Sequence, residues 1–254
     1  MPVLCENLSP SITRLVLDRP KKMNAMNKEM LESLSAHLKE LNKRDDLRCL
    51  IITGSGDAFS TGADIAMDSG LIDFSKPLDL GFVLQTHFYP VISELRSFSC
   101  PIVMAVNGPC VGFGFSLALY GDLIVAQNDA YFWMNFIEMG VIPDGGSTFV
   151  LPRLVGKLAA TKIALLAEKI SAEEASEMGL VCQVYDRDCF GDSVLALAEK
   201  IVAKPPEVVK SLRRLLNTSM DNDFEQQLED EAGLQTHLGC CDAFRQAVAN
   251  FFKK

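Results

Sequence analysis

Short apolar segments rich in β-branched residues alternate with helical patterns along most of the chain, and this alternation restricts the possible folds more than any other feature. The segments cover residues 12–17, 47–53, 102–106, 123–126 and 181–185. Continuous apolar runs of this length are typical of strands that are buried on both faces, as in sheets built from β-α-β units. The pattern therefore predicts an α/β fold around a largely parallel sheet.

Helix signals lie between these segments. Apolar residues at helical spacing follow Asn27, a possible N-cap, and predict a helix that covers one face of the sheet. Ser171 and Glu174 have the spacing of a capping box, and Gly179 suits a helix end, so a short helix is expected before the fifth strand. Residues 66–81 are the best candidate for a mobile loop.

The pattern changes at Lys204-Pro205-Pro206, after which no further strand is expected. The remaining residues predict two or three helices, with Pro206 in a first helical turn. We therefore expect a core domain over residues 1–203 and a helical region over residues 204–254. An apolar stripe near the end would be exposed on an isolated tail, so it should pack on the core or on another subunit. It consists of Phe244, Ala247, Val248, Phe251 and Phe252.

Composition excludes several classes of protein. The 254 residues include 24 Lys and Arg against 33 Asp and Glu, and the net charge of -9 provides no field that attracts nucleic acid or anionic membranes. The beginning of the chain lacks the regions of a signal peptide, and no apolar run approaches the ~20 residues that span a bilayer. A cytoplasmic protein with neither nucleic acid nor membrane as partner is expected.

The cysteines and histidines do not predict a metal site. None of the eight cysteines forms a C-x-x-C pair, and several, such as Cys49, lie in apolar runs. They are interpreted as small buried hydrophobic residues in a reducing compartment. The three histidines lie far from one another and from any cysteine cluster, so the spacing of zinc ligands is lacking.

Glycine-rich turns follow the second and third predicted strands, at residues 53–65 and 105–118. The first has Phe59 where a dinucleotide fingerprint needs glycine, and no Lys-Ser/Thr follows as in a P-loop. Both turns can be ordinary connections between a strand and a helix. Alternatively, free N–H groups at the two turns can donate to one oxyanion from opposite sides.

A third turn, at residues 140–148, contains Asp144. Pro-Asp-Gly is a turn signature, and in that interpretation Asp144 is a solvated turn residue. Its apolar flanks, including Val141 and Ile142, instead allow a desolvated carboxylate with a raised pKa.

Four motifs, in their order and spacing, resemble the crotonase (enoyl-CoA hydratase/isomerase) superfamily over nearly the whole chain. They are Arg19-Pro-Lys-Lys-Met-Asn-Ala, Ala58-Phe-Ser-Thr-Gly-Ala-Asp-Ile65, Pro101-Ile-Val-Met-Ala-Val-Asn-Gly108 and Gly140-Val-Ile-Pro-Asp-Gly-Gly146. The resemblance implies a spiral of ββα units and a C-terminal helical region that covers the acyl site and builds homotrimers or hexamers. It also implies acyl-CoA ligands, with no cofactor apart from the coenzyme A of the substrate.

The resemblance further implies the positions of the site. Two backbone N–H groups, those of Ala63 and of Phe113 after Gly112, would hold the thioester oxygen. The other residues expected to contact the acyl-CoA are Lys21 and Lys22 near its phosphates, Asp64, Ile65 and Ala66 beside Ala63, and Phe136 at the acyl pocket, where core packing is the alternative.

Departures from the family pattern decide the expected reaction. Hydratases of the family have glutamates where this chain has Ser116 and Phe136, so the pair that activates water is absent. Asp144 resembles the Asp/Glu position of the family's enoyl-CoA isomerases and epoxyphenylacetyl-CoA isomerases, and Glu138 is its rival as acid/base residue. The resemblance thus predicts a Δ3 to Δ2 enoyl-CoA isomerase. A ring-expanding isomerase of epoxidised aryl-acetyl-CoA and a non-catalytic acyl-CoA-binding protein are the alternatives.

Overall fold

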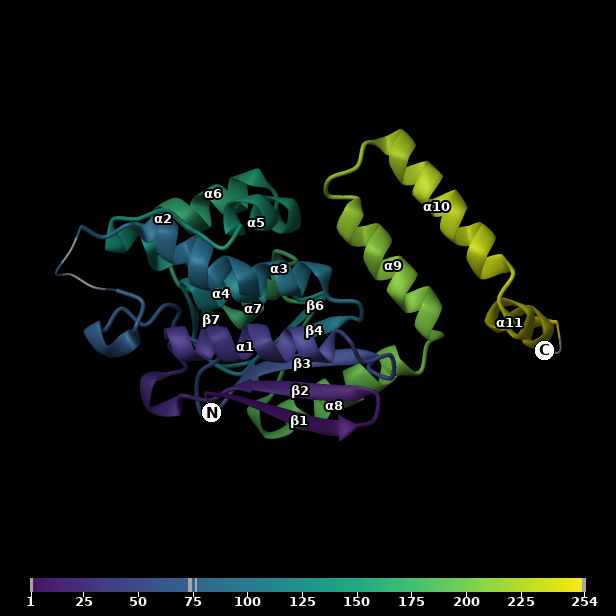
Figure 1. The fold of residues 1–254 in the computed structure, drawn as a ribbon, viewed down its shortest axis with the longest axis horizontal. Coiled ribbons are helices and arrows are strands. Elements are labelled where there is room, and N and C mark those ends of the chain that lie inside the picture. The colour runs from purple at the N-terminus through teal and green to yellow at the C-terminus, as the bar shows by residue number, and fades with distance from the viewer. Residues whose placement is uncertain (1, 73–74, 76, 253–254) are drawn as a thin grey trace.

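The computed structural model describes residues 2–72, 75 and 77–252. Its central feature is a six-stranded sheet with the strand order β1-β2-β3-β4-β6-β9 (Figure 1). These strands are β1 (Val3–Ser9), β2 (Ile12–Leu17), β3 (Cys49–Gly54), β4 (Ile102–Val106), β6 (Leu123–Gln127) and β9 (Gln183–Tyr185). All neighbouring pairs are parallel except β1 and β2. The predicted α/β fold is confirmed.

The edge strand β1 was not expected from the sequence. Val3 is its only fully buried residue, so its pattern differs from the continuous apolar runs of the parallel strands. It pairs antiparallel with β2 across a short connection, where Ile12 N donates to Ser9 Oγ. A smaller sheet of three short strands was also not expected. It consists of β5 (Cys110–Val111), β7 (Tyr131–Trp133) and β8 (Ile170–Ser171).

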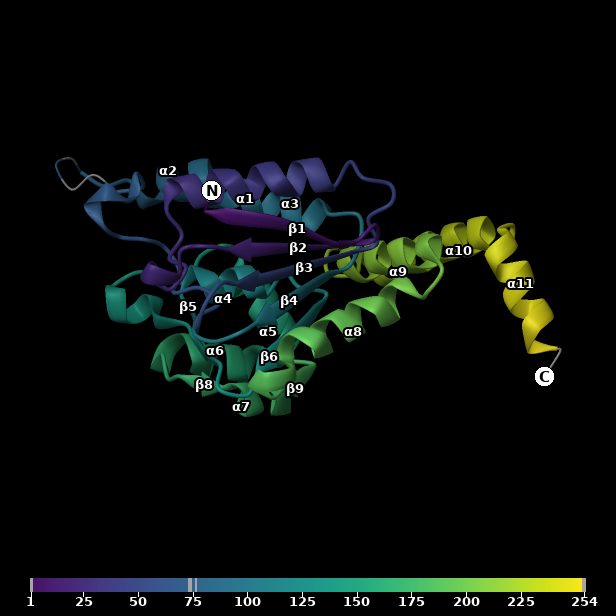
Figure 2. The same ribbon diagram turned by 90° about the horizontal axis from the view of Figure 1, so that it is seen from below.

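Helices cover both faces of the large sheet. Helices α1 (Lys28–Leu41) and α3 (Tyr89–Ser97) lie on one face, and α8 (Phe190–Val202) lies on the other (Figure 2). The side chain of Asn27 caps α1 by accepting from Met30 N at 2.9 Å, which confirms the predicted start. The apolar residues predicted to face the core from α1 are all buried, namely Met30, Leu31, Leu34, Leu38 and Leu41.

The remaining helices of the body are short. They are η1 (Pro20–Lys22), η2 (Met67–Ser69), α2 (Leu80–Val83), the π-helical η3 (Leu84–Phe88), α4 (Phe113–Ala118), η4 (Asn135–Met139), α5 (Ser147–Val155), α6 (Lys157–Leu166), α7 (Ala172–Glu177) and η5 (Arg187–Cys189). The capping box of Ser171 and Glu174 is present at the start of α7. The loop predicted at residues 66–81 includes η2, and its residues 73, 74 and 76 lie outside the described part of the chain.

Three helices follow Pro206 and extend away from the body (Figures 1 and 2). They are α9 (Pro206–Thr218), α10 (Phe224–Gly239) and α11 (Asp242–Phe251). Arg213 fastens α9 to the body, because its buried guanidinium contacts Asp122 at 2.7 Å and donates to the carbonyls of Phe98 and Leu95. Several large apolar side chains of α10 and α11 are exposed, including Phe224, Phe244 and Phe251. Among the described residues, no helix combines the length and apolar character that crossing a bilayer requires.

The interpretation of the cysteines as buried hydrophobic residues is only partly right. Cys49, Cys100 and Cys110 are buried in or beside the sheet. The other five are wholly or partly exposed. Cys5 lies on the edge strand β1, and Cys240 and Cys241 lie between helices that project from the body, so these three positions have few neighbours to bury them.

Candidate active site

The two glycine-rich turns lie side by side. Ser60 and Cys110 form a parallel bridge between them. Val111 N donates to the carbonyl of Ser60 at 2.9 Å, and Ser60 N donates to the carbonyl of Pro109 at 3.1 Å. Since both turns follow the carboxyl ends of the neighbouring strands β3 and β4, the sheet itself brings them together.

Gly62 lies at a close approach of the two turns. Its φ of +90° lies in a region that favours glycine. A methyl group on its Cα would lie only 2.8 Å from the carbonyl oxygen of Val111 and 3.0 Å from Phe113 N. The absence of a side chain at Gly62 therefore lets the chain around Ala63 pack against the start of α4.

The backbone amides of Ala63 and Phe113 find no acceptor among the residues that the structure describes. Phe113 is the first residue of α4, where an N–H group has no acceptor within the helix. On either side of Ala63, the carbonyl of Gly62 and the N–H of Asp64 bond to Met26, at 2.7 and 2.9 Å. Within the described chain, neither the Ala63 nor the Phe113 amide donates a hydrogen bond to the protein.

The turn that carries Asp144 packs over α4. Gly145 has a φ of +61°, and a methyl group there would lie 2.9 Å from the ring of Phe113 and 3.1 Å from Ser116 Cβ. The hydroxyl of Tyr120 donates to the carbonyl of Gly145 at 2.7 Å and holds the turn in place. The structure therefore places Asp144 next to the helix whose first amide is that of Phe113.

The carboxyl group of Asp144 is largely desolvated. Its Oδ1 atom is buried and has no hydrogen-bond partner among the described residues. Burial raises the pKa of Asp144 to about 7. Of the two interpretations of this turn, a desolvated carboxylate describes the structure and a solvated turn residue does not.

The residues at the two hydratase glutamate positions bring no charge to this region. Ser116 is fully buried in α4, and its hydroxyl has no partner among the described residues. Phe136 is buried in η4 and belongs to the main hydrophobic core. Glu138, two residues later, is exposed on the same short helix.

The residues expected to border coenzyme A lie on the adjacent surface. Lys21 and Lys22 are exposed on η1, and Ile65 is exposed beyond Ala63. Asp64 differs, because it is buried and paired with Arg19 at 2.8 Å. Sequence analysis gave Arg19 no role in the site, because no local sequence pattern indicates a contact between residues 45 positions apart.

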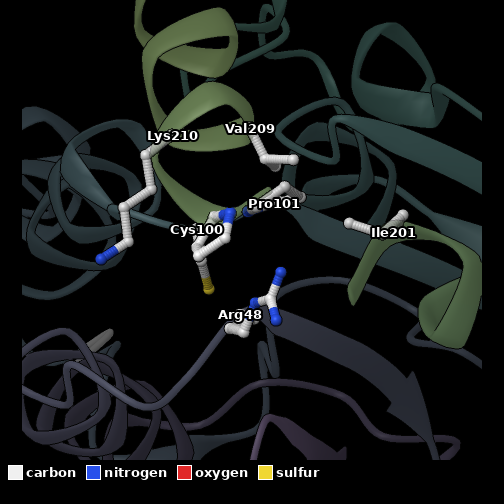
Figure 3. Close-up of a pocket in the computed structure, with 7 residues that line it drawn as sticks. Arg48, Cys100, Pro101, Ile201, Val209 and Lys210 are labelled. Carbon is white, nitrogen blue, oxygen red and sulfur yellow. The ribbon is translucent and has the colours of Figure 1, made fainter. Parts of the chain in front are cut away.

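A pocket elsewhere contains none of the predicted site residues. It lies where α9 leaves the body, between the body and the first turns of α9 (Figure 3). Its lining consists of Arg48, Cys100, Pro101, Ile201, Pro206, Val209 and Lys210. The guanidinium of Arg48 donates to the carbonyl of Lys204 there, so the pocket belongs to the junction with the C-terminal helices.

Comparison with known proteins identifies the family. The family model for enoyl-CoA hydratase/isomerase matches residues 7–254. The 1,2-epoxyphenylacetyl-CoA isomerase of Escherichia coli K12 is 33% identical over 255 residues, which cover 100% of this chain and 97% of the relative. The 2,3-dehydroadipyl-CoA hydratase of the same organism is 30% identical, with 94% of this chain and 91% of the relative covered.

Solved structures agree with this result. The crystal structure of an enoyl-CoA hydratase from Mycobacterium smegmatis superposes with a TM-score of 0.91 at 25% identity, covering 100% of this chain and 96% of the other. The expected crotonase fold is thereby confirmed. Relatives named as isomerases and relatives named as hydratases are both similar to the chain. The chain belongs to the enoyl-CoA hydratase/isomerase family.

Proposed function

We propose that this enzyme isomerises 3-enoyl-CoA thioesters to 2-enoyl-CoA thioesters with Asp144 as its single acid/base group. The observation that carries the proposal is the desolvated carboxyl of Asp144, which lies beside α4 and whose Oδ1 has no partner among the described residues. In the reaction, the carboxylate takes a proton from C2 of the substrate and returns it at C4. The double bond thereby moves into conjugation with the thioester carbonyl.

The raised pKa of Asp144 suits this task. A group that removes and returns the same proton works best when its pKa lies close to the working pH. With a pKa of about 7, Asp144 is basic enough to remove a proton and acidic enough to give it back. An exposed carboxylate with a pKa of about 4 would be a much weaker base.

The negative charge that develops on the thioester oxygen needs donors, and the amides of Ala63 and Phe113 are proposed to supply them. Support comes from their position on adjoining turns and from the absence of a protein acceptor for either amide among the described residues. Preorganised donors stabilise an enolate most when water is excluded. Phe113 is buried, which favours such an environment.

Isomerisation is favoured over hydration because a second carboxylate is lacking at the family positions. Ser116 and Phe136 occupy them, and neither side chain can activate water as a carboxylate does. We therefore expect negligible hydration of 2-enoyl-CoA. Hydration at a rate comparable to isomerisation would contradict this assignment.

A ring-expanding isomerisation is the second candidate, and a specific observation favours it. One relative, 33% identical over the whole chain, is named as a 1,2-epoxyphenylacetyl-CoA isomerase. The same carboxylate and the same two amides would serve a bulkier aryl substrate. Parallel assays with 3-hexenoyl-CoA and with an epoxidised phenylacetyl-CoA distinguish the two reactions by their relative kcat/KM.

The direct test is a spectrophotometric assay with 3-hexenoyl-CoA. We expect a conjugated product, and we expect Asp144→Asn to form it at a small fraction of the wild-type rate. Binding of coenzyme A thioesters without conversion of either substrate would instead indicate a non-catalytic acyl-CoA-binding protein.

We also propose that the chain forms homotrimers or hexamers through its C-terminal helices. The apolar side chains exposed on α10 and α11, among them Phe224, Phe244 and Phe251, support this proposal. Sedimentation analysis tests it: Phe244→Asp should shift the oligomer towards monomers, and a wild-type monomer would contradict it.

A further inference from the structure

Ala63 is fixed in place by a hydrogen-bonded connection to the segment at Ala25 and Met26. It forms a parallel bridge with Met26, and the backbone groups on both sides of it bond to that residue. In a parallel bridge of this kind, the N–H of the central residue points away from its partner. The direction of the Ala63 amide therefore depends on how the two segments lie against each other.

Arg19 joins these same two segments through its side chain. Its Nη1 atom donates to the carbonyl of Ala25 at 2.5 Å and to Oδ2 of Asp64 at 2.8 Å. The other oxygen of Asp64, Oδ1, accepts from Ala66 N at 3.1 Å. One guanidinium nitrogen thus connects the residue before Met26 with the residue after Ala63.

The pair is shielded from water. The side chain of Asp64 is 8% exposed and that of Arg19 is 21% exposed. Burial opposes ionisation of Asp64, but the hydrogen bonds from Arg19 and Ala66 N, together with the positive charges of Arg19 and Lys22, lower the pKa of this carboxyl. When one partner of such a pair is lost, the other remains as a buried charge without compensation, so the local structure must rearrange.

Arg19 lies beside Lys21 and Lys22, and a role in binding the phosphates of coenzyme A is the competing interpretation. The hydrogen bonds of Arg19 Nη1 are directed inward, to Ala25 and Asp64. The two lysines, by contrast, are exposed and form no ion pair within the described residues. The geometry therefore separates a cation held by inward hydrogen bonds from two exposed cations.

We infer that Arg19 and Asp64 are positioning residues, whose ion pair aims the N–H of Ala63 at the thioester oxygen. The inference rests on the proposed function, because it assigns a purpose to the amide proposed as an oxyanion donor. Neither side chain contacts the reacting atoms. Their effect is exerted through the backbone between Gly62 and Asp64.

The test uses infrared spectroscopy of bound hexanoyl-CoA that carries ¹³C at the thioester carbonyl. This saturated ligand is not isomerised, and hydrogen bonds from the protein lower the frequency of its carbonyl stretch. The wild-type protein is expected to lower it, whereas Asp64→Asn and Arg19→Gln are expected to lose most of that shift. Arg19→Lys retains the positive charge but cannot reproduce both hydrogen bonds of the guanidinium, to Ala25 and Asp64. Its carbonyl frequency should therefore lie between those of the wild type and of Arg19→Gln.

Kinetics with 3-hexenoyl-CoA provide the second measurement. Displacing a catalytic group by about 1 Å can lower the reaction rate on the order of 100-fold. The kcat of Asp64→Asn should therefore fall about 10- to 100-fold. KM should change by less, because the defect concerns charge that develops in the transition state. The Arg19→Gln/Asp64→Asn double variant should resemble the single variants, since both changes break the same connection.

Asp122→Asn is the matched control. The pair of Asp122 with Arg213 has a similar geometry and burial, at 2.7 Å with side chains 23% and 7% exposed, but it fastens α9. This variant should lower the melting temperature and leave the carbonyl frequency at the wild-type value. If folded Asp64→Asn and Arg19→Gln also retain that frequency and the wild-type kcat, the inference is overturned while the proposed function stands. A wild-type protein that neither shifts the carbonyl nor isomerises 3-hexenoyl-CoA overturns both.

Discussion

Two aspartates beside the proposed oxyanion donors differ sharply in their surroundings. Asp64 accepts hydrogen bonds from Arg19 and from Ala66 N, and its pKa is lowered despite burial. Asp144 has a buried oxygen with no partner among the described residues, and burial raises its pKa to about 7. Identical side chains thus have a lowered pKa in one turn and a raised pKa in the other, and we propose that only the second carries a proton.

The difference follows from the donors that each turn offers. Around Asp64, a guanidinium and a backbone amide point at the carboxylate. Around Asp144, the next residue packs against the ring of Phe113, and the hydroxyl of Tyr120 binds a backbone carbonyl and not the carboxylate. An unpartnered buried polar group is costly to stability and is commonly retained for function.

The largest expected effect is that of Asp144→Asn on turnover. The amide retains the shape of the carboxyl but cannot carry a proton, so kcat should fall by about 10²- to 10⁴-fold. Affinity for acyl-CoA should stay within a few-fold of wild type, as measured by calorimetry with a saturated acyl-CoA. Near-wild-type turnover would mean that Asp144 is not the acid/base group.

Phe113→Pro should have the next largest effect, because it removes one N–H donor outright. Loss of one such donor costs on the order of 10²- to 10³-fold in turnover. Phe113→Ala retains the N–H and is the control, with measurable turnover expected. Circular dichroism and oligomer size must first show that both variants fold. Equal rates for the two folded variants would remove Phe113 from the oxyanion site.

The two aspartates should have opposite effects on stability. Because the pKa of Asp144 is raised on folding, its ionisation weakens the fold as the pH rises from about 4 to about 7. Asp144→Asn should therefore increase the free energy of unfolding above pH 7, by up to about 4 kcal/mol, and make little difference below pH 4.

Asp64 is the opposite case, because its pKa is lowered on folding and its ionised form stabilises the fold. Asp64→Asn should decrease the free energy of unfolding at pH 7, by roughly 3 kcal/mol, since it leaves Arg19 unpaired. This loss should shrink as the pH falls below the usual aspartate pKa of about 4. Urea unfolding of both variants at several pH values gives the comparison, and changes of the same sign at pH 8 would contradict it.

The smallest effect is expected for Glu138→Gln. Its carboxylate is exposed on η4, so replacing it should change kcat by no more than about two- to threefold. The same assay as for Asp144→Asn measures this variant. An inactive Glu138→Gln beside an active Asp144→Asn would transfer the acid/base role to Glu138.

Much of this arrangement could be predicted from the sequence. Continuous apolar runs identified the parallel strands, and the two glycine-rich turns recognised after two of them lie side by side in the structure. The edge strand β1 was missed because only Val3 is buried in it. The exposed cysteines were misjudged because sequence periodicity does not show that Cys240 lies on helices projecting from the body.

The environment of each aspartate was less predictable. The apolar flanks of Asp144 indicated desolvation, but Val141 and Ile142 are themselves exposed. The burial of Oδ1 without a partner among the described residues depends instead on how the turn at Gly145 packs over α4. The pairing of Arg19 with Asp64 joins residues 45 positions apart, and only the folded chain brings them together. No local sequence pattern indicates a contact between residues so far apart in the chain.

The pH dependence of kcat/KM for 3-hexenoyl-CoA tests the central claim, that Asp144 is the proton carrier, most directly. Asp144 must be ionised in the free enzyme before it can accept the proton from C2. We expect kcat/KM to rise about tenfold per pH unit below pH 7 and to level off above an apparent pKa of about 7. A profile that is flat from pH 5 to 9, as a carboxylate with an ordinary pKa of about 4 would give, contradicts it.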